Sequence, residues 1–368
     1  MNLQKWDTSY EWKIVLLLTL GFGLVGLDRW IIAPLLPSIM RDLSLSYQDV
    51  GLIFGALGIT WGVFAIFAGS LSDKIGHRKI LIVSLLVFSL ASGFSGSAMG
   101  LTSLILIRAL MGISEGVFWV VAIPGFILAA CLFFVLREPQ NTQGGQLLIA
   151  QKNTEAHVKV NWMELLKTRN ILLSMIGLFC TMSCVFVISA MVPLYLENFL
   201  KMNPQDMGII VSAIGFGGFL GQFLVPALSD WIGRRMASIL GFLGSAIFIY
   251  LFANASASLS VLFGLLFVVS FFSLGLIALL SGPLAAESAP VGLVASAIGL
   301  VVGAGEIFGG GVAPVISGII AENYGIQNIF YLSLIGAIIG MFISFFILET
   351  APRKVQNIQA FEIEPTQE

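Results

Sequence analysis

Long apolar runs separated by short polar segments occur along the whole chain. Ten of these runs have about 18 or more residues, which at 1.5 Å per residue lets a helix cross a hydrocarbon core of roughly 30 Å. They lie at residues 14–37, 50–70, 80–98, 101–136, 170–195, 207–228, 237–254, 259–283, 292–318 and 327–348. The pattern predicts an all-α, polytopic membrane protein with about ten transmembrane helices.

The fourth run is longer than one crossing needs. It extends over 36 residues from Leu101 to Leu136 without a polar linker. If it crosses once, 14 of the 18 Lys and Arg residues lie on the same side as the N-terminus, and the positive-inside rule makes that side cytoplasmic. Two crossings would place Arg234 and Arg235 outside. We therefore expect one crossing, with both termini cytoplasmic.

An internal repeat relates the two halves of the chain. Residues 47–79 align without gaps to residues 204–236, with 12 identical positions of 33. The identities include polar pairs in register, among them Asp73 with Asp230, which shared membrane composition does not readily produce. Parallel repeats of this kind are common in transporters. We interpret the two halves as parallel repeats.

The repeat also indicates that the first half lacks a segment. Residues 118–136 match the final span, 330–348, at an offset of 212, whereas the earlier alignment has an offset of 157. The first half would therefore lack about 55 residues, which leaves four spans against six. We expect the domains to be a four-span bundle at 1–137, a cytoplasmic linker at 138–168 with a short helix at 161–167, a six-span bundle at 169–351 and a cytoplasmic tail at 352–368.

Composition excludes several classes of function. The chain is 58% hydrophobic and only 10% charged, and its mean hydropathy is +0.98. No basic patch with interleaved aromatic residues suggests a nucleic-acid partner. Cys131, Cys180 and Cys184 fall within predicted spans without further metal ligands, so we expect no disulfide framework, metal site or cofactor. An enzyme is not expected.

Four charged residues lie at a similar depth within predicted spans. Asp28, Arg29 and Glu306 lie about 22 Å from the inner ends of their spans, and Arg108 lies about 10 Å from the outer end of its own. Charges within spans are costly and usually functional. Arg29 and Arg108 are candidates for binding an anionic substrate, because a guanidinium grips a carboxylate or phosphate through two hydrogen bonds. The alternative is structural pairing with Asp28 or Glu306.

Acidic residues within the spans are candidates for proton coupling. Glu115 lies deeper in the membrane, where binding of a substrate to a nearby arginine would change its affinity for a proton. Glu306 and Asp28 are further candidates, although we expect Asp28 to be structural. A hydrogen-bonded carboxyl between helices is the alternative for Glu115.

A charged loop follows the second span of each half. "GSLSDKIGHRK" and "ALSDWIGRR" place an acid, a glycine turn and basic residues at the cytoplasmic end of the membrane. A hairpin turn that only fixes topology would also need these residues. The pattern resembles the signature loop of the major facilitator superfamily, although His77, Pro226 and Trp231 depart from it.

This resemblance covers nearly the whole chain and implies an architecture. Two six-helix bundles would rock about a central site, with the loops acting as a latch on the outward-facing state. The implied latch residues are Gly69, Asp73, Gly76, Arg78, Lys79, Asp230, Gly233, Arg234 and Arg235.

A second motif narrows the resemblance. "RALMGISEGVFW" at 108–119 and "LDRWIIAPLLP" in the first span resemble the anion:cation symporter branch, but Val120 stands where that branch has proline. The resemblance implies a monomeric carrier in the plasma (inner) membrane that moves a small organic anion, of carboxylate type, together with protons. No ATP-binding motif is present, so an ion gradient would drive it.

Two alternatives stay open from the sequence. A drug-efflux carrier would have aromatic and acidic cavity residues without paired arginines. A transport-inactive remnant would result if the missing segment removes one wall between the bundles. Glycines at 51, 55, 58 and 62, and at 305 and 309, are spaced for close helix packing in either case.

Overall fold

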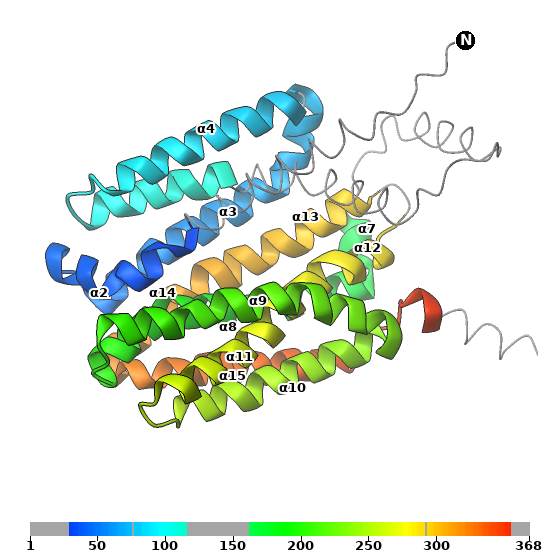
Figure 1. Ribbon diagram of the computed structural model, residues 1–368. Helices are drawn as coiled ribbons and strands as arrows, with labels where there is room; N and C mark the ends of the chain where they lie inside the picture. Colours follow the sequence, from blue (N-terminus) through cyan, green and yellow to red (C-terminus); the bar gives the residue numbers. More distant parts are fainter. Residues whose placement is uncertain (1–28, 76, 116–161, 291–292, 355–368) are drawn as a thin grey trace, which may run out of the picture.

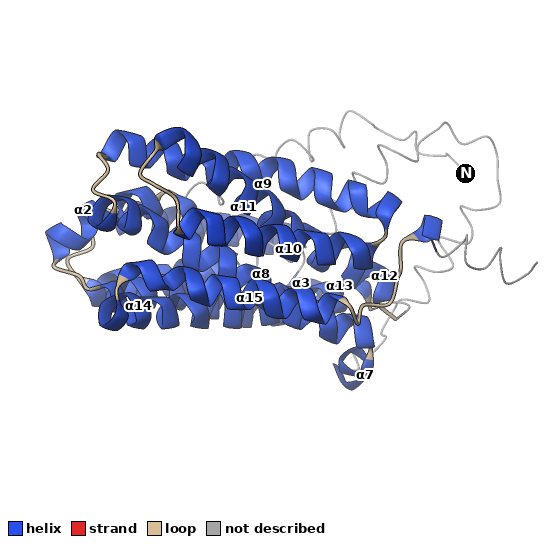
Figure 2. Cartoon of the chain, turned by 90° about the horizontal axis from the view of Figure 1, so that it is seen from below, coloured by secondary structure: helices blue, strands red, loops and turns tan. Residues whose placement is uncertain are grey.

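The described helices run nearly parallel to one another in one bundle. The computed structural model describes residues 29–75, 77–115, 162–290 and 293–354, and Figures 1 and 2 show these helices from two sides. Within these ranges the regular structure is helical and no strand occurs, which confirms the predicted all-α class. The helices before the 116–161 segment are α2 (Ile32–Leu43), α3 (Tyr47–Ile75), α4 (His77–Ser95) and a helix over 101–115.

The remaining helices contain three π-helical segments that the hydrophobic pattern did not predict. In order they are α7 (Trp162–Lys167), α8 (Arg169–Leu194) with η1 (Tyr195–Phe199), α9 (Pro204–Ile232), α10 (Arg234–Ala253), α11 (Leu259–Leu279) with η2 (Leu280–Leu284) and α12 (Ala285–Ser288), α13 (Val294–Gly305) with η3 (Glu306–Val312) and α14 (Ala313–Tyr324), and the 3₁₀ turn η4 (Ile326–Asn328) before α15 (Ile329–Ser344). The α7 helix confirms the short helix predicted in the linker.

Seven stretches of the described residues are long and apolar enough to cross a membrane. Six of them follow one another from Arg169 to Ser344, and the seventh is Tyr47–Ile66 in α3. The predicted runs at 14–37 and 101–136 are described only in part, so the count of ten spans stays a prediction. The division into domains also stays a prediction.

The α3 helix lies along the α13–η3–α14 rod with almost no space between the two backbones. A Cβ added at Gly58 would lie 2.3 Å from the carbonyl carbon of Gly310, and one at Gly51 would lie 2.5 Å from the carbonyl oxygen of Pro314. Without a strong hydrophobic force between helices in lipid, such close packing is a main source of helix association. The predicted packing role of the α3 glycines is confirmed.

The same rod packs against α8 through its other glycine pair. A Cβ at Gly305 would lie 2.8 Å from side-chain atoms of Leu178, and one at Gly309 would lie 2.8 Å from the carbonyl oxygen of Phe179. The α13–η3–α14 rod is therefore held between α3 and α8. This arrangement brings a helix from each half of the sequence against the same rod.

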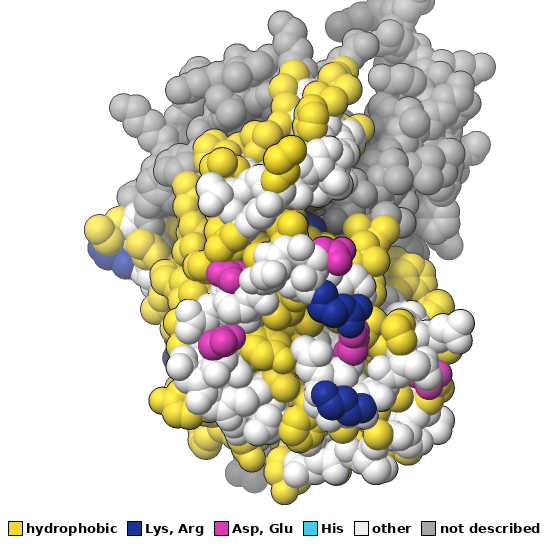
Figure 3. All heavy atoms as spheres, turned by 90° about the vertical axis from the view of Figure 1, so that its left-hand side faces the viewer, with side chains coloured by type: hydrophobic (Ala, Val, Ile, Leu, Met, Phe, Trp, Pro, Cys, Tyr) yellow, Lys and Arg dark blue, Asp and Glu magenta, His cyan; other side chains and the backbone are white. Residues whose placement is uncertain are grey.

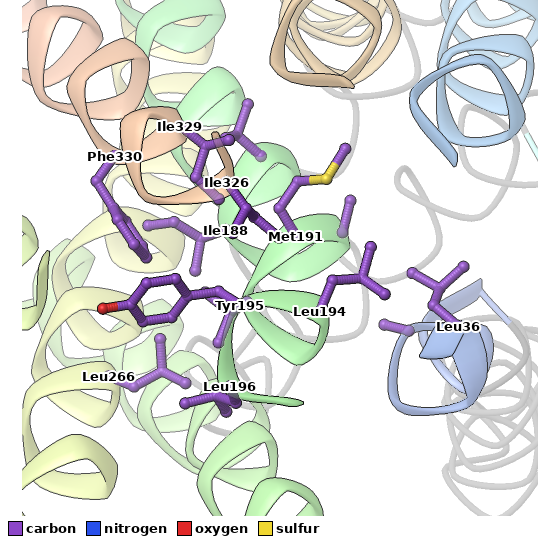
Figure 4. Close-up of a cluster of buried hydrophobic side chains, with 14 of the residues drawn as sticks. Leu36, Ile188, Met191, Leu194, Tyr195, Leu196, Leu266, Ile326, Ile329 and Phe330 are labelled. Carbon is purple, nitrogen blue, oxygen red and sulfur yellow. The ribbon is translucent and has the colours of Figure 1, made fainter. Parts of the chain in front are cut away.

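An apolar cluster surrounds the end of α8. Tyr195 is buried, and its ring packs edge-on against Phe330 with the centroids 4.9 Å apart. Figure 4 shows Leu194 directed toward Leu36 of α2, while Tyr195 lies between Leu266 and Phe330. The cluster joins α2 to the helices that follow residue 162.

The α9 helix leaves one face without a protein neighbour in the described part of the chain. Gly208 and Gly215 are the repeat counterparts of Gly51 and Gly58, yet a Cβ at either would meet nothing within 4 Å. Phe216, Phe219 and Phe223 on the same helix are each more than 60% exposed. The face that α3 uses for tight packing is thus open on α9.

Gly58→Ala and Gly215→Ala form a matched pair that tests the close packing. We expect Gly58→Ala to lower the free energy of unfolding by about 1–3 kcal/mol, because the new methyl group overlaps the Gly310 backbone. Gly215→Ala should change it by no more than about 0.5 kcal/mol. Thermal unfolding of the detergent-purified protein measures both, and equal shifts would contradict this account.

Candidate functional site

One arginine binds two carboxylates inside the bundle. The Nη1 atom of Arg29 lies 2.7 Å from Oε1 of Glu115, and its Nη2 atom lies 2.8 Å from Oε2 of Glu306. All three side chains are buried. Arg29 and Glu115 precede the 116–161 segment and Glu306 follows it, so the cluster connects the two parts of the sequence.

Aromatic rings enclose the Arg29 guanidinium on its remaining sides. Its Cζ atom lies 4.8 Å from the ring centre of Phe186 and 5.7 Å from those of Trp30 and Trp61. A desolvated guanidinium is attracted to the faces of such rings. Trp61 is therefore part of the cluster's surroundings.

The η3 segment positions Glu306. A π-helical turn adds a residue to the helix and often marks a functional site. The carboxylate of Glu306 folds back over its own helix, since a Cβ on Gly310 would lie only 2.4 Å from Oε2. The run Gly309–Gly311 therefore has two uses: it admits α3 and α8 on its outside, and it leaves room for the acid.

A small pocket opens beside the cluster. Its lining residues are Arg29, Trp30, Ile53, Phe54, Leu57, Arg108 and Phe186. Arg108 is 4% exposed, and the buried Nε of Arg29 donates no hydrogen bond within the described residues. Both arginines that the sequence singled out thus line one pocket. Asp28, the remaining candidate of this group, lies outside the described residues.

Among the described residues, the buried formal charges around this pocket cancel. Arg29 and Arg108 supply two positive charges, and Glu115 and Glu306 supply two negative ones. The expectation that Glu115 lies deeper than Arg29 did not anticipate their contact, because a helical-rise estimate ignores the reach of a long arginine side chain. Pairing of Arg29 with Glu306 was anticipated, whereas for Glu115 the sequence suggested a nearby arginine without identifying it.

Polar contacts join the two parts of the sequence at the end of the bundle that contains Arg41, which we call the Arg41 end. Arg41 pairs with Glu197. The Nδ2 of Asn198 donates to the Tyr47 hydroxyl at 2.9 Å, and the Tyr47 amide donates to Glu322 at 3.0 Å. Figure 3 looks onto this end, where acidic and basic side chains lie among apolar ones. Sequence reasoning missed these contacts, because isolated charges beside spans give no pairing signal.

The second copy of the loop forms an ion cluster at the opposite end, which we call the Arg234 end. The buried Arg234 lies 2.6 Å from Asp230 and 2.7 Å from Glu287, and it also contacts Ser229. Glu287 was missed by the sequence analysis because it lies 53 residues from Arg234 along the chain.

Gly233 and Glu349 shape this loop. Gly233 has a φ of 100°, and a Cβ there would lie 2.3 Å from Oε2 of Glu349. The Glu349 carboxylate accepts hydrogen bonds from the amides of Arg234 and Arg235 at 2.7 and 3.3 Å. It thus satisfies amides at the start of α10, where the helix dipole favours a negative charge.

The rest of the predicted latch is partly described. Trp231 stands where the resemblance expects a basic residue, and Arg353 lies over its ring at 4.4 Å. Gly69 and Asp73 lie in α3, and Arg78 and Lys79 lie in α4. The side chains of Asp73, Arg78 and Lys79 are not described, and Gly76 lies outside the described residues.

Comparison with known proteins assigns the family. The family model of the Major Facilitator Superfamily matches residues 18–124, 115–301 and 175–366. The chain belongs to the Major Facilitator Superfamily. It is therefore a multi-pass integral membrane protein of a transporter family and not an enzyme.

Curated relatives match this major facilitator over a limited region. The hexuronate transporter of Bacillus subtilis (strain 168) is 38% identical over 103 residues, which are 28% of this chain and 24% of that protein. The quinolone resistance protein NorA of Staphylococcus aureus (strain Mu50 / ATCC 700699) is 31% identical over 102 residues, also 28% and 24%. The matched region thus spans about a quarter of each relative.

Solved structures match the fold over almost its full length. A bacterial homologue of the human lysosomal transporter Spinster, in an inward-facing and occupied conformation, superimposes with a TM-score of 0.67 at 15% identity and covers 92% of this chain and 97% of that chain. The unoccupied inward-facing form gives 0.65 at 14% identity, with the same coverage. These similarities establish the fold of this major facilitator.

Replacing Glu287 or Asp230 by alanine tests the cluster at the Arg234 end. We expect Glu287→Ala to destabilise the protein by about 1.5–3 kcal/mol, because the guanidinium loses two charge-assisted hydrogen bonds but keeps Asp230. Asp230 is half-exposed, so Asp230→Ala should cost at most about 1 kcal/mol. Melting temperatures of the two purified variants measure both effects. A larger decrease for Asp230→Ala than for Glu287→Ala would contradict this prediction.

Proposed function

We propose that this chain is a secondary transporter that carries a small organic anion of carboxylate type together with protons. The observation that carries the proposal is the Arg29 guanidinium, held by Glu115 and Glu306 beside a pocket that Arg108 also lines. Two buried arginines at one pocket suit an anion better than a neutral or cationic solute.

Charge balance couples binding of the anion to binding of a proton. The four buried charges that the described residues supply at the pocket cancel, so a monoanion that enters alone would add an uncompensated negative charge in apolar surroundings, which is costly. A proton on Glu115 or Glu306 removes that charge. It also releases one side of the Arg29 guanidinium, which can then bind the substrate carboxylate. Anion and proton therefore bind more favourably together than apart.

Alternating access follows from where the partners lie. The Arg29–Glu306 bond joins a helix of the first bundle to one of the second, so its release on protonation would loosen the contact between the bundles. The Arg41 end is closed by contacts between the two parts of the sequence. The similar Spinster-homologue structures carry the description inward-facing, and the basic residues favour a cytoplasmic Arg234 end. We propose a monomer in the plasma (inner) membrane with both termini cytoplasmic.

Two relatives point to different substrates. The hexuronate transporter's name describes an organic anion, which agrees with the paired arginines. NorA's name describes quinolone resistance and keeps drug efflux as the second candidate. Transport that survives Arg29→Ala and Arg108→Ala would favour efflux, since a hydrophobic drug does not require these guanidinium groups.

Uptake into proteoliposomes tests proton-coupled anion transport. With radiolabelled hexuronate as the probe, lowering the external pH should increase uptake, because the proton travels inward with the anion. Glu306→Gln should abolish this pH dependence, and Arg108→Lys should reduce uptake by at least about tenfold, because lysine lacks the planar two-point grip.

Arg169→Lys provides the control, because Arg169 is exposed at the start of α8 and does not line the pocket. It should leave uptake unchanged. Uptake that ignores both external pH and Arg108→Lys would disprove the proposal.

The open face of α9 supports the further alternative of a transport-inactive remnant. On α3 the equivalent face packs against η3 and α14. Those segments belong to the part of the second half, residues 277–331, whose counterpart the first half is predicted to lack. A chain without that counterpart would leave one side of the interface between bundles to lipid or water.

Restoring the predicted segment tests the remnant alternative. Residues 277–331 of the same chain can be duplicated between Trp119 and Val120, where the repeat places the gap. We expect the native chain to show proton-coupled uptake and the extended chain to match or exceed it. Activity of the extended chain alone would show that the native chain is a remnant.

A further inference from the structure

A second pocket lies among α8, α9 and α11, and it contains a group of serines. Its lining residues are Val185, Ile188, Ser189, Ile214, Val269, Ser270, Ser273 and Leu274. The three serines come from two helices and are each at most 4% exposed. The remaining lining is aliphatic and contains no charged group. The pocket can therefore offer hydroxyl groups in otherwise apolar surroundings.

The Ser189 hydroxyl has no hydrogen-bond partner in the described structure although it is buried. Serines in helices usually bond to a backbone carbonyl one turn earlier, as Ser183 does on the same helix by donating to Phe179 at 2.8 Å. A buried hydroxyl without a partner is unfavourable. A ligand hydroxyl can both donate to it and accept from it.

The neighbouring Ser273 is held in place. Its hydroxyl lies 3.1 Å from that of Ser245, and its carbonyl oxygen accepts a hydrogen bond from Thr181 at 2.9 Å. The pocket therefore combines a fixed hydroxyl with the unsatisfied one of Ser189. Such a pre-positioned pair lowers the entropy cost of binding a polar ligand.

The serine pocket is close to the arginine pocket along α8. Phe186 lines the arginine pocket and Ser189 lines the serine pocket. Residues three apart on a helix lie on the same side and are separated by roughly 4.5 Å along the axis. The two pockets therefore lie along the same side of α8.

We propose that the serine pocket binds the hydroxyl groups of the transported anion, so that the substrate is a hydroxylated carboxylate of the sugar-acid class. The inference rests on the proposed anion transport. The carboxylate binds at Arg29 and Arg108, and the hydroxyl groups at the far end of the molecule bind Ser189 and Ser273. An anion without hydroxyl groups would leave Ser189 unsatisfied and therefore binds more weakly.

Binding of three probes to the detergent-purified full-length chain separates the two pockets. Glucuronate has a carboxylate and hydroxyl groups, hexanoate has only the carboxylate, and methyl glucoside has only hydroxyl groups. We expect the wild-type protein to bind glucuronate most tightly. Ser189→Ala should weaken glucuronate binding by about fivefold to tenfold, the effect of one hydrogen bond, and leave hexanoate unchanged.

Ser174→Ala is the matched control. Ser174 is also a buried α8 serine whose hydroxyl lacks a partner, but it does not line the pocket. Its replacement should change the affinity for none of the three probes.

The outcomes distinguish the two proposals. Equal effects of Ser189→Ala on glucuronate and hexanoate, or no effect on glucuronate, would overturn the serine site while leaving anion transport standing. Binding of methyl glucoside that depends on Ser189, with no effect of Arg108→Lys on glucuronate, would uphold the serine site and overturn the anion proposal. Absence of binding by all three probes would overturn both.

Discussion

The pairing of one buried guanidinium with two carboxylates is the interaction on which the rest of the structure depends. Arg29 reaches Glu115 on its own side of the 116–161 segment and Glu306 on the other. Burying such charges is expensive, and they are tolerated only when each remains paired. The helices before and after the 116–161 segment are thus held together by buried ion pairs, a kind of contact that weakens when a carboxylate takes up a proton or another anion competes for the guanidinium. A purely apolar interface would be insensitive to both.

The glycine faces are what allow that contact to form. Helices in lipid gain little from hydrophobic burial against one another, so close approach depends on small residues. Gly58 brings the α3 backbone against η3, and Gly310 leaves space for the Glu306 carboxylate on the same turn. The α13–η3–α14 rod, which carries Glu306, is therefore fixed between α3 and α8. This fixed position keeps Glu306 within reach of Arg29. Packing and charge pairing depend on the same short glycine run.

The sequence predicted the helical class, the glycine packing faces and the candidate charges, because each follows from local spacing or from the cost of polarity in lipid. It could not predict the π-helical turn at Glu306, since hydrophobic periodicity does not report a single inserted residue. It also missed Glu197, Glu287 and Glu349. Their partners are distant in sequence, and a lone acid beside a span is compatible with many neighbours. The sequence likewise cannot predict that the buried Ser189 hydroxyl lacks a hydrogen-bond partner in the described structure, because this depends on how the helices pack.

Because of the internal repeat, α3 and α9 occupy equivalent positions in the two halves of the chain. Two helices with related sequences have opposite surroundings: Gly51 of α3 touches the Pro314 backbone, while a Cβ on its counterpart Gly208 would meet nothing within 4 Å in the described part of the chain. Sequence similarity alone would assign both faces the same role. The difference arises because a helix face is used only if a complementary helix exists, and the first half is predicted to lack the one that would cover α9. Because the Arg29 cluster lies on the α3 side of this asymmetry, its geometry is complete without that helix. On the proposed mechanism, the charge coupling would persist in a chain whose opposite interface is open, and transport would then depend on whether the exposed α9 face admits solvent.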